Sequence, residues 1–344
     1  AGIEVAQAPR QGRNSARAVG TTPLSEIMAK GSRKFDAVPV EPDDPAVILY
    51  TSGTTGNPKG VTLTHRNFHF QCNTVVPSMV PFTHEDRAVG VLPLYHVYGL
   101  ANAMVASVNS GACFIMVAQY SPQNLLDAIA ENKATIMPAI PSMYQHLLTI
   151  ARSRKASIPR SLRYCVSGGA PLSRSVLKEF GEVFDTRISE GYGLTETTSS
   201  VCCNVDGEGY KEGSIGRAAD GVEMRVFDEN DQELPDGEVG EIVIRSDTVT
   251  PGYWNNDEAT AEQINAEGWF HTGDLGYMDE DGVFFITDRK KDVVDHCSSN
   301  MAPYKRPKMV EFVQSLPKSA TGKVLRTELR GEATDRRLVE REVQ

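Results

Sequence analysis

Short apolar runs alternate with amphipathic segments between residues 44 and 193. The runs, typical of buried strands, are Ala46–Tyr50, Ala88–Leu92, Ala112–Ala118, Thr135–Ala139 and Leu162–Val166. The amphipathic segments have apolar residues three and four positions apart, which predicts helices at Pro122–Asn132, Pro141–Ser153 and Ser173–Phe184. Strands that alternate with helices indicate an α/β fold, in which a parallel sheet carries helices on both faces.

The pattern changes after about residue 213. Val222–Asp228, Gly240–Arg245 and Gly282–Asp288 predict strands, joined by turns rich in Asp, Pro and Gly. This part predicts a small antiparallel β unit attached to the α/β part. The first 40 residues show little periodicity apart from a short helix expected near Thr22–Ala29, and the segment from Arg289 onward is basic and polar.

Composition and charge exclude several classes of protein. The 344 residues carry 35 Lys and Arg against 45 Asp and Glu, so the chain lacks the basic surface of a nucleic-acid binder. No apolar run approaches the roughly 20 residues of a membrane helix. Six cysteines without a CxxC pair, and no signal-peptide stretch at the start, predict a reduced, cytoplasmic protein. Peripheral membrane contact and the oligomeric state stay open.

A loop rich in Gly and Thr, Thr51–Gly60, directly follows the first apolar run. Glycines let a backbone approach an anion closely, hydroxyls add donors and a lysine adds positive charge, which suits a polyphosphate. The residues expected to contact it are Thr51, Ser52, Gly53, Thr54, Thr55, Gly56 and Lys59. The loop is not a Walker loop, because Lys59 lies between Pro58 and Gly60. The alternative is a solvated turn.

Six further motifs follow this loop along the chain. They are Pro93–Gly99 (PLYHVYG), Ser167–Leu172 (SGGAPL), Gly191–Glu196 (GYGLTE), Trp269–Asp274 (WFHTGD), Asp288–Asp292 (DRKKD) and Pro317–Lys323 (PKSATGK). In this order the motifs resemble those of the adenylate-forming (AMP-binding) superfamily, which includes acyl-CoA synthetases, coumarate-type ligases and peptide-synthetase adenylation domains. The resemblance runs from about residue 40 to 294 and resumes from about 302 to 330.

The resemblance implies two acyl transfers. A carboxylic acid attacks the α-phosphate of ATP in the presence of Mg2+, giving an acyl-adenylate and pyrophosphate, and CoA then takes the acyl group. A fatty acid is favoured, because the segments near His96–Met104 and Pro138–Tyr144 contain no charged anchor for an amino group. Two alternatives stay open: a non-catalytic remnant that binds a nucleotide or acyl-adenylate, and an adenylation domain that loads a carrier protein.

The resemblance also implies roles for single residues, beginning with the nucleotide. The loop would hold the β- and γ-phosphates, Thr195 would donate to the α-phosphate, and Glu196, with Thr51, would bind Mg2+. Asp274 would accept the ribose hydroxyls and Arg289 would add a ribose or phosphate contact. The adenine site would consist of Gly168, Gly169, Ala170, Gly191, Tyr192 and Gly193, with the Tyr192 ring against the base.

Two further residues would act on the acid and on the reaction itself. His96 would help to orient the carboxylate, and Lys323 would stabilise the pentacovalent phosphate by its charge. Lys291 would be the hinge of a mobile C-terminal domain. The catalytic set implied by the resemblance is therefore Lys59, His96, Thr195, Glu196 and Lys323.

Each of these residues has a structural alternative when it is taken alone. Thr195 and Glu196 could begin a helix, and Asp274 could form an Asx turn. His96 could be a half-buried histidine of the core. His65 and His69 stand four apart, as zinc ligands can, but Thr64 is a natural N-cap and no third ligand is evident.

The chain also departs from the family pattern. Only about 50 residues precede the loop, where family members carry a further α/β segment, and the Gly-rich loop expected after Val294 is missing. We therefore expect a lead-in remnant at 1–40, an incomplete AMP-binding domain at 41–290 and a short remnant of the C-terminal domain at 291–344.

Overall fold

The centre of the fold is a seven-stranded mixed sheet. The computed structural model describes residues 24–32, 34, 36–51, 58–153, 158–205 and 209–289. The strand order is β4-β3-β5-β6-β7-β8-β9, parallel from β4 to β7 and antiparallel from β7 to β9. The strands are β3 (Arg87–Gly90), β4 (Cys113–Met116), β5 (Ile136–Ala139), β6 (Tyr164–Ser167), β7 (Ile188–Leu194), β8 (Ser199–Asn204) and β9 (Arg217–Ala218). The expected α/β fold is confirmed, and the sheet is parallel in its first five strands.

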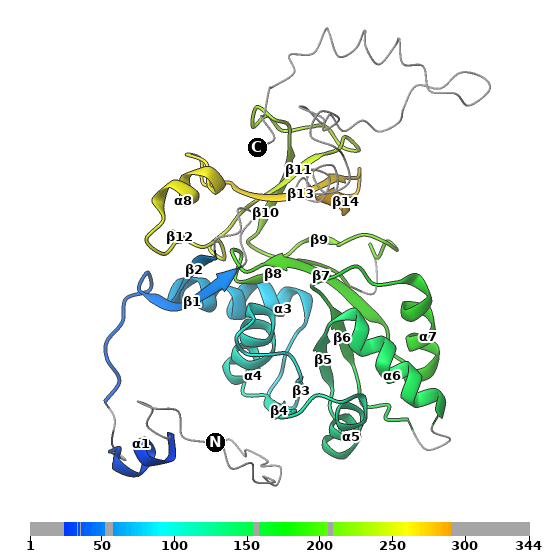
Figure 1. Cartoon of the computed structure of the whole chain (residues 1–344). Helices are drawn as coiled ribbons and strands as arrows, with labels where there is room; N and C mark the ends of the chain where they lie inside the picture. Colours follow the sequence, from blue (N-terminus) through cyan, green and yellow to red (C-terminus); the bar gives the residue numbers. More distant parts are fainter. Residues whose placement is uncertain are drawn as a thin grey trace, which may run out of the picture.

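Helices cover both faces of this sheet (Figure 1). On one face lie the helices that the periodicity predicts: α5 (Pro122–Asn132), α6 (Pro141–Ser153) and α7 (Arg174–Phe184). On the other lie α2 (His65–Phe70), α3 (Val76–Met79), α4 (Ala106–Asn109) and two π-helical segments, η1 (Gln71–Val75) and η2 (Tyr98–Val105). Ser173 is the N-cap of α7, because its side chain accepts a hydrogen bond from the N–H of Val176.

A second, antiparallel sheet has the order β10-β11-β13-β14. Its strands are β10 (Glu223–Phe227), β11 (Gly240–Arg245), β13 (Phe270–Met278) and β14 (Phe284–Arg289), and α8 (Asp257–Gln263) precedes β13. The sequence predicts β10, β11 and β14 but not β13. The reason is that β13 contains the polar sequence His-Thr-Gly-Asp and lacks the alternation of a half-buried strand.

One expectation about the first apolar run is wrong. Ala46–Tyr50 is a strand, but it does not belong to the parallel sheet. It lies in β1 (Pro45–Thr51), which pairs antiparallel with β2 (Lys59–Thr64); β12 (Gly252–Tyr253) completes this third sheet. A parallel connection needs a crossover of about a dozen residues or more, and the loop between Thr51 and Lys59 is too short for that.

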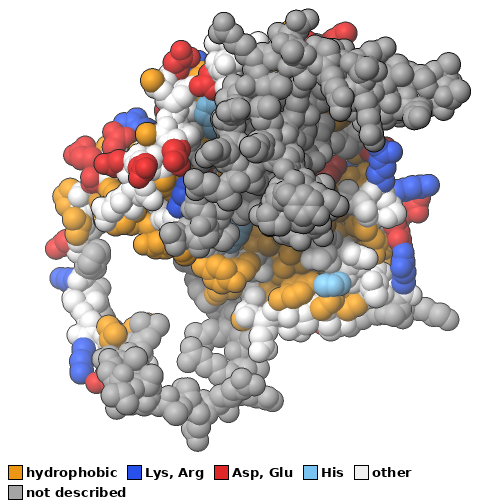
Figure 2. All heavy atoms as spheres, turned by 45° about the horizontal axis from the view of Figure 1, so that its top comes forward, with side chains coloured by type: hydrophobic (Ala, Val, Ile, Leu, Met, Phe, Trp, Pro, Cys, Tyr) orange, Lys and Arg blue, Asp and Glu red, His pale blue; other side chains and the backbone are white. Residues whose placement is uncertain are grey.

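The remaining features concern the surface. α1 (Leu24–Lys30) lies apart from the sheets (Figure 1). Large apolar side chains such as Tyr50, Tyr95 and Trp254 are exposed, and Figure 2 shows apolar side chains gathered on the face that it presents. Among the residues that the structure describes, no helix is long and apolar enough to cross a membrane.

Candidate functional site

Two glycine motifs meet where the carboxyl end of β6 lies beside β7. Gly168 directly follows β6, and a Cβ on it would lie 3.2 Å from Cε1 of Tyr98 and 3.4 Å from the carbonyl oxygen of Gly191. Gly169 has a φ of +80°, which side chains other than glycine rarely adopt. Ala170 follows and is exposed. Ligands of α/β folds bind at this edge of the sheet, so the placement fits the predicted nucleotide site.

A buried hydrogen bond joins Tyr192 of β7 to Asp274 of β13. The Tyr192 hydroxyl donates to Oδ2 of Asp274 over 2.7 Å, and the two residues are 9% and 2% exposed. Burial, and the neighbouring Asp274, hold the pKa of the Tyr192 hydroxyl well above its usual range, so the phenol keeps its proton. The structure thus brings together the residues expected at adenine and ribose, although most of the Tyr192 ring is packed into the core.

A second group of polar residues lies at the turn that follows β7. Tyr253 of β12 donates a 3.1 Å hydrogen bond to Oε1 of Glu196, and Nζ of Lys59 lies 4.9 Å from the centre of the Tyr253 ring. Burial raises the pKa of Glu196, and the Tyr253 hydroxyl and the charge of Lys59 oppose this rise without cancelling it. Thr51 pairs with Lys59 between β1 and β2. The third sheet therefore places Lys59 beside Tyr253, the donor to Glu196, and holds Thr51 opposite Lys59.

Sequence reasoning missed Tyr253, which connects Lys59 with Glu196. Its only local signal is an aromatic residue after Gly252 in a turn-rich stretch, which is common in loops. The contact depends on the pairing of Tyr253 with Val61 across β12 and β2. That pairing joins segments far apart in the sequence, so no local pattern could have predicted it.

Thr195 and Glu196 lie in a tight turn between β7 and β8, so the alternative in which they begin a helix is wrong. A Cβ on Gly193 would lie 1.8 Å from the carbonyl oxygen of Ser199, so only glycine permits the close approach of the two strands. The N–H of Thr250 donates to the carbonyl of Glu196 over 2.7 Å, which attaches the turn to the segment before β12.

His96 lies near the glycine motifs but not in the core. Its ring is exposed, and Nδ1 accepts a 3.1 Å hydrogen bond from the N–H of Tyr98. The Tyr98 hydroxyl donates to the carbonyl of Val166 over 2.8 Å. Behind Tyr98 lies a mainly apolar cavity between α3, η2 and the large sheet, lined by Val76, Met79, Val80, Phe82, Tyr98, Asn102, Ile136, Pro138, Val166, Ser200 and Cys203.

The donor set fits a magnesium ion that arrives with a nucleotide. Within the part of the chain that the structure describes, no group of three or more His, Cys, Asp or Glu side chains could hold a metal by itself. Glu196 supplies one carboxylate, and Mg2+ is commonly bound by one or two carboxylates together with substrate phosphates and water. Thr64 caps α2 as expected, so His65 and His69 are held by a helix that needs no metal.

Several predicted site residues lie outside the described residues: Ser52, Gly53, Thr54, Thr55, Gly56, Lys291 and Lys323. Arg289 is the last residue of β14.

Comparison with known proteins agrees with this geometry. The AMP-binding enzyme family model matches residues 4–254, and the model of the AMP-binding enzyme C-terminal domain matches residues 278–323. A long-chain-fatty-acid–CoA ligase of Bacillus subtilis is 32% identical over 86% of this chain and 63% of that protein. A 4-coumarate–CoA ligase 1 of Solanum tuberosum is 30% identical over 90% of this chain and 69% of its own length.

A solved structure shows the same fold. ATP-bound MatB from Rhodopseudomonas palustris superposes with a TM-score of 0.71 at 30% identity, covering 91% of this chain and 73% of that one. The chain thus spans less than two thirds of the length of some of the curated relatives that it matches, such as the Bacillus ligase. The family match nevertheless covers most of the sequence. The protein therefore belongs to the AMP-binding enzyme family.

Proposed function

We propose that the protein activates a carboxylic acid, by preference a fatty acid, to acyl-AMP with release of pyrophosphate, and transfers the acyl group to CoA. The observation that carries this proposal is the convergence around the end of β7. The glycine motifs and the Tyr192–Asp274 hydrogen bond involve β7 itself, and Glu196, in the turn after β7, accepts a hydrogen bond from Tyr253, whose ring lies beside Lys59.

Each part of this group suits one portion of MgATP. Asp274 is a buried carboxylate that accepts hydrogen bonds, as ribose hydroxyls require. Glu196 offers a hard oxygen ligand to the cation that ATP carries. Lys59 adds a positive charge at the end of the loop expected to hold the departing pyrophosphate. Thr195, beside Glu196, would donate to the α-phosphate.

The apolar lining of the cavity behind Tyr98 suits an apolar acid as the second substrate, but the cavity, at about 20 Å³, has room for about one water molecule and would have to widen to admit the acid. Its wall includes Val76, Met79, Ile136 and Val166, and none of the described residues that line it is charged. An amino acid would need a counter-charge for its ammonium group, because an unpaired charge is costly to bury. His96 lies next to Tyr98 at the exposed side, where the carboxylate of the acid would meet the α-phosphate.

ATP–pyrophosphate exchange tests the first half-reaction directly. Purified protein is given MgATP, labelled pyrophosphate and a panel of fatty, aryl and amino acids. We expect exchange with fatty acids, and loss of exchange in Glu196→Ala but not in Glu258→Ala, which removes an exposed glutamate of α8. No exchange with any acid on folded protein would contradict the proposal and favour a binding remnant.

The second half-reaction needs its own assay. Acyl-CoA formation is followed with the best acid from the panel. Lys323→Ala tests the first half-reaction instead: it is expected to slow adenylation, because it removes the charge that stabilises the pentacovalent phosphate. Transfer to a holo-carrier protein without transfer to CoA would instead favour the loading domain.

A further inference from the structure

Asp274 is presented by a bulge in β13, not by regular strand. Glu241 of β11 pairs with Leu275, and Val243 pairs with His271. One residue of β11 therefore faces three residues of β13: Thr272, Gly273 and Asp274. Bulges redirect side chains beside active sites, and a bulge keeps its shape only where neighbouring groups bind its backbone.

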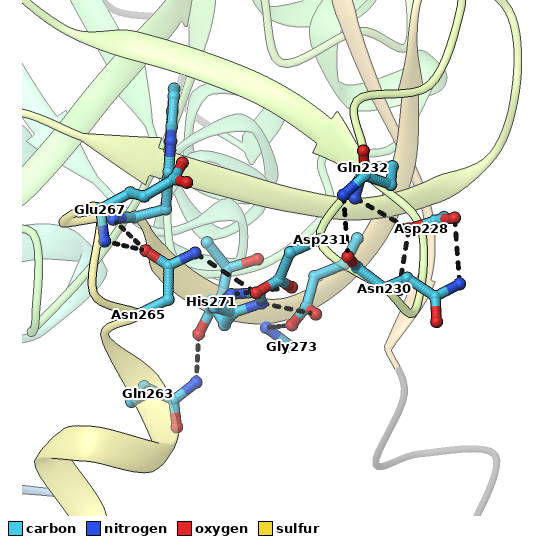
Figure 3. Close-up of polar contacts among 12 residues, drawn as sticks. Asp228, Asn230, Asp231, Gln232, Gln263, Asn265, Glu267, His271 and Gly273 are labelled. Carbon is cyan, nitrogen blue, oxygen red and sulfur yellow. Dashed lines mark hydrogen bonds and ion pairs between the residues drawn. The ribbon is translucent and has the colours of Figure 1, made fainter. Parts of the chain in front are cut away.

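The Glu241 side chain contacts the bulge at Gly273 and the residue just before it, His271, two positions that Figure 3 labels. Its Oε1 accepts the Gly273 N–H over 2.8 Å, and its Oε2 lies 3.1 Å from Nδ1 of His271. Glu241 is 7% exposed, so its carboxylate has left water for these partners. Gly273 has a φ of +75°, which places its N–H toward Glu241 in a conformation that other residues rarely adopt.

The histidine is itself held from two further directions (Figure 3). Nε2 of His271 lies 3.5 Å from Oδ1 of Asp231, and the Gln263 side-chain amide donates to the His271 carbonyl. Within the bulge, the Thr272 hydroxyl donates to the carbonyl of Ile242 over 2.7 Å and accepts the Asp274 N–H over 3.1 Å. Glu241 thus belongs to a set of contacts that fixes the three residues directly before Asp274.

We infer that Glu241 is a positioning residue, which sets Asp274 to accept the ribose hydroxyls of the nucleotide without touching the nucleotide itself. This inference rests on the proposed function. It predicts that Glu241 strengthens the binding of the ribose hydroxyls and does not strengthen the binding of nucleotides that lack them. A merely structural role would weaken every nucleotide by the same factor.

Calorimetric binding of ATP and of 2′,3′-dideoxy-ATP to the full chain, with Mg2+ and without acid, measures this difference. We expect wild-type protein to prefer ATP about tenfold or more, since hydrogen bonds to a charged acceptor are among the stronger ones. Glu241→Ala should reduce this preference to about threefold or less. Glu241→Gln should keep most of it, because an amide oxygen can accept the Gly273 N–H and the amide can donate to a neutral His271.

The controls separate folding from positioning. Glu223→Ala removes a glutamate of β10 in the same sheet, whose carboxylate makes an exposed pair with Arg245, and should leave the preference unchanged. Should Glu241→Ala fail to fold, Glu241→Asp replaces it. Its shorter carboxylate cannot reach both Gly273 and His271, so its preference should fall below that of Glu241→Gln.

The two possible failures are distinct. Equal binding of both nucleotides by wild-type protein would overturn the ribose role of Asp274, and the inference with it. A wild-type preference for ATP that Glu241→Ala, or Glu241→Asp in its place, retains in full would overturn the inference alone.

Discussion

The hydroxyl of Tyr192 donates a 2.7 Å hydrogen bond to Oδ2 of Asp274 and so joins the large sheet to the four-stranded sheet. Both residues are buried, so neither can exchange this bond for water. Removing a hydrogen bond of this kind takes a donor away from a buried carboxylate, which costs more than the bond contributes on average. The contact therefore links the nucleotide site to the stability of the fold.

Tyr192→Phe is expected to lower the free energy of unfolding by about 1–3 kcal/mol, because it removes a donor to a buried carboxylate. Urea unfolding followed by circular dichroism measures the change. Tyr95→Phe is the matched control, since Tyr95 is 83% exposed and should have no effect. Equal unfolding midpoints for Tyr192→Phe and the wild type would show that the hydroxyl contributes nothing to stability.

Lys59→Ala is expected to raise the KM for MgATP about tenfold, because it removes a positive charge at the end of the loop expected to hold the departing pyrophosphate. Thermal stability should change little, because the lysine is half-buried and its described contact is with the Tyr253 ring. ATP–pyrophosphate exchange at varied ATP gives the KM. Lys178→Ala, which removes an exposed lysine of α7, is the control for lost positive charge. A KM that shifts equally in both variants would assign the effect to net charge.

Local patterns predicted the elements whose burial is set by their own sequence. α5, α6 and β11 begin and end where the sequence predicts, because one apolar stripe decides each helix and a continuous apolar run, Ile242–Ile244, decides the strand. β13 was missed, because its central residues bind partners instead of alternating between core and solvent. The misplaced strand, Ala46–Tyr50, shows the limit of the method: a strand's sequence does not say which strand it pairs with.

The site was predictable in its motifs but not in its supports. Glu196, Tyr192 and Asp274 are predicted as site residues because each belongs to a run of residue types that resembles the motifs of the family. Tyr253 and Glu241 act through contacts with residues distant in the sequence, and each looks ordinary in its own strand. Physical reasoning could reach them only after the pairing of β12 with β2 and the bulge in β13 were known.

The cavity behind Tyr98 leads to a prediction on acid length. Val80 lines the cavity and is 7% exposed, and because the cavity must widen to admit an acid, the larger ring of Val80→Phe would oppose that widening. We expect the exchange reaction to shift toward shorter acids while the KM for MgATP stays unchanged, and the larger ring to cost about 1–3 kcal/mol of stability. Val80→Ile adds only one methyl(ene) and serves as the control. An unchanged acid preference in a folded Val80→Phe variant would place the acid elsewhere.

Protonation of Glu196 has opposite effects on the stability of the fold and on the binding of the cation. Burial raises the pKa of its carboxyl, so the folded state holds the proton more tightly than the unfolded state does. The stability from Glu196 is therefore fully present below the unfolded pKa of about 4.3 and is lost as pH rises through the folded pKa. Glu196→Gln, which carries no charge at any pH, should be more stable than the wild type at about pH 7, and the difference should shrink as the pH falls.

Cation binding runs the other way, since Mg2+ needs the ionised carboxylate and protons compete for it below the folded pKa. As the pH falls, the affinity of the wild type for MgATP should therefore begin to weaken at a higher pH than it would if the pKa of Glu196 were not raised. Glu196→Gln should bind MgATP more weakly at every pH, and its affinity should depend less on pH. Urea unfolding and calorimetric MgATP titrations of both proteins between about pH 5 and 8 measure the two slopes. Parallel binding profiles would show that Glu196 does not ligate the cation, even if the stability difference behaves as expected.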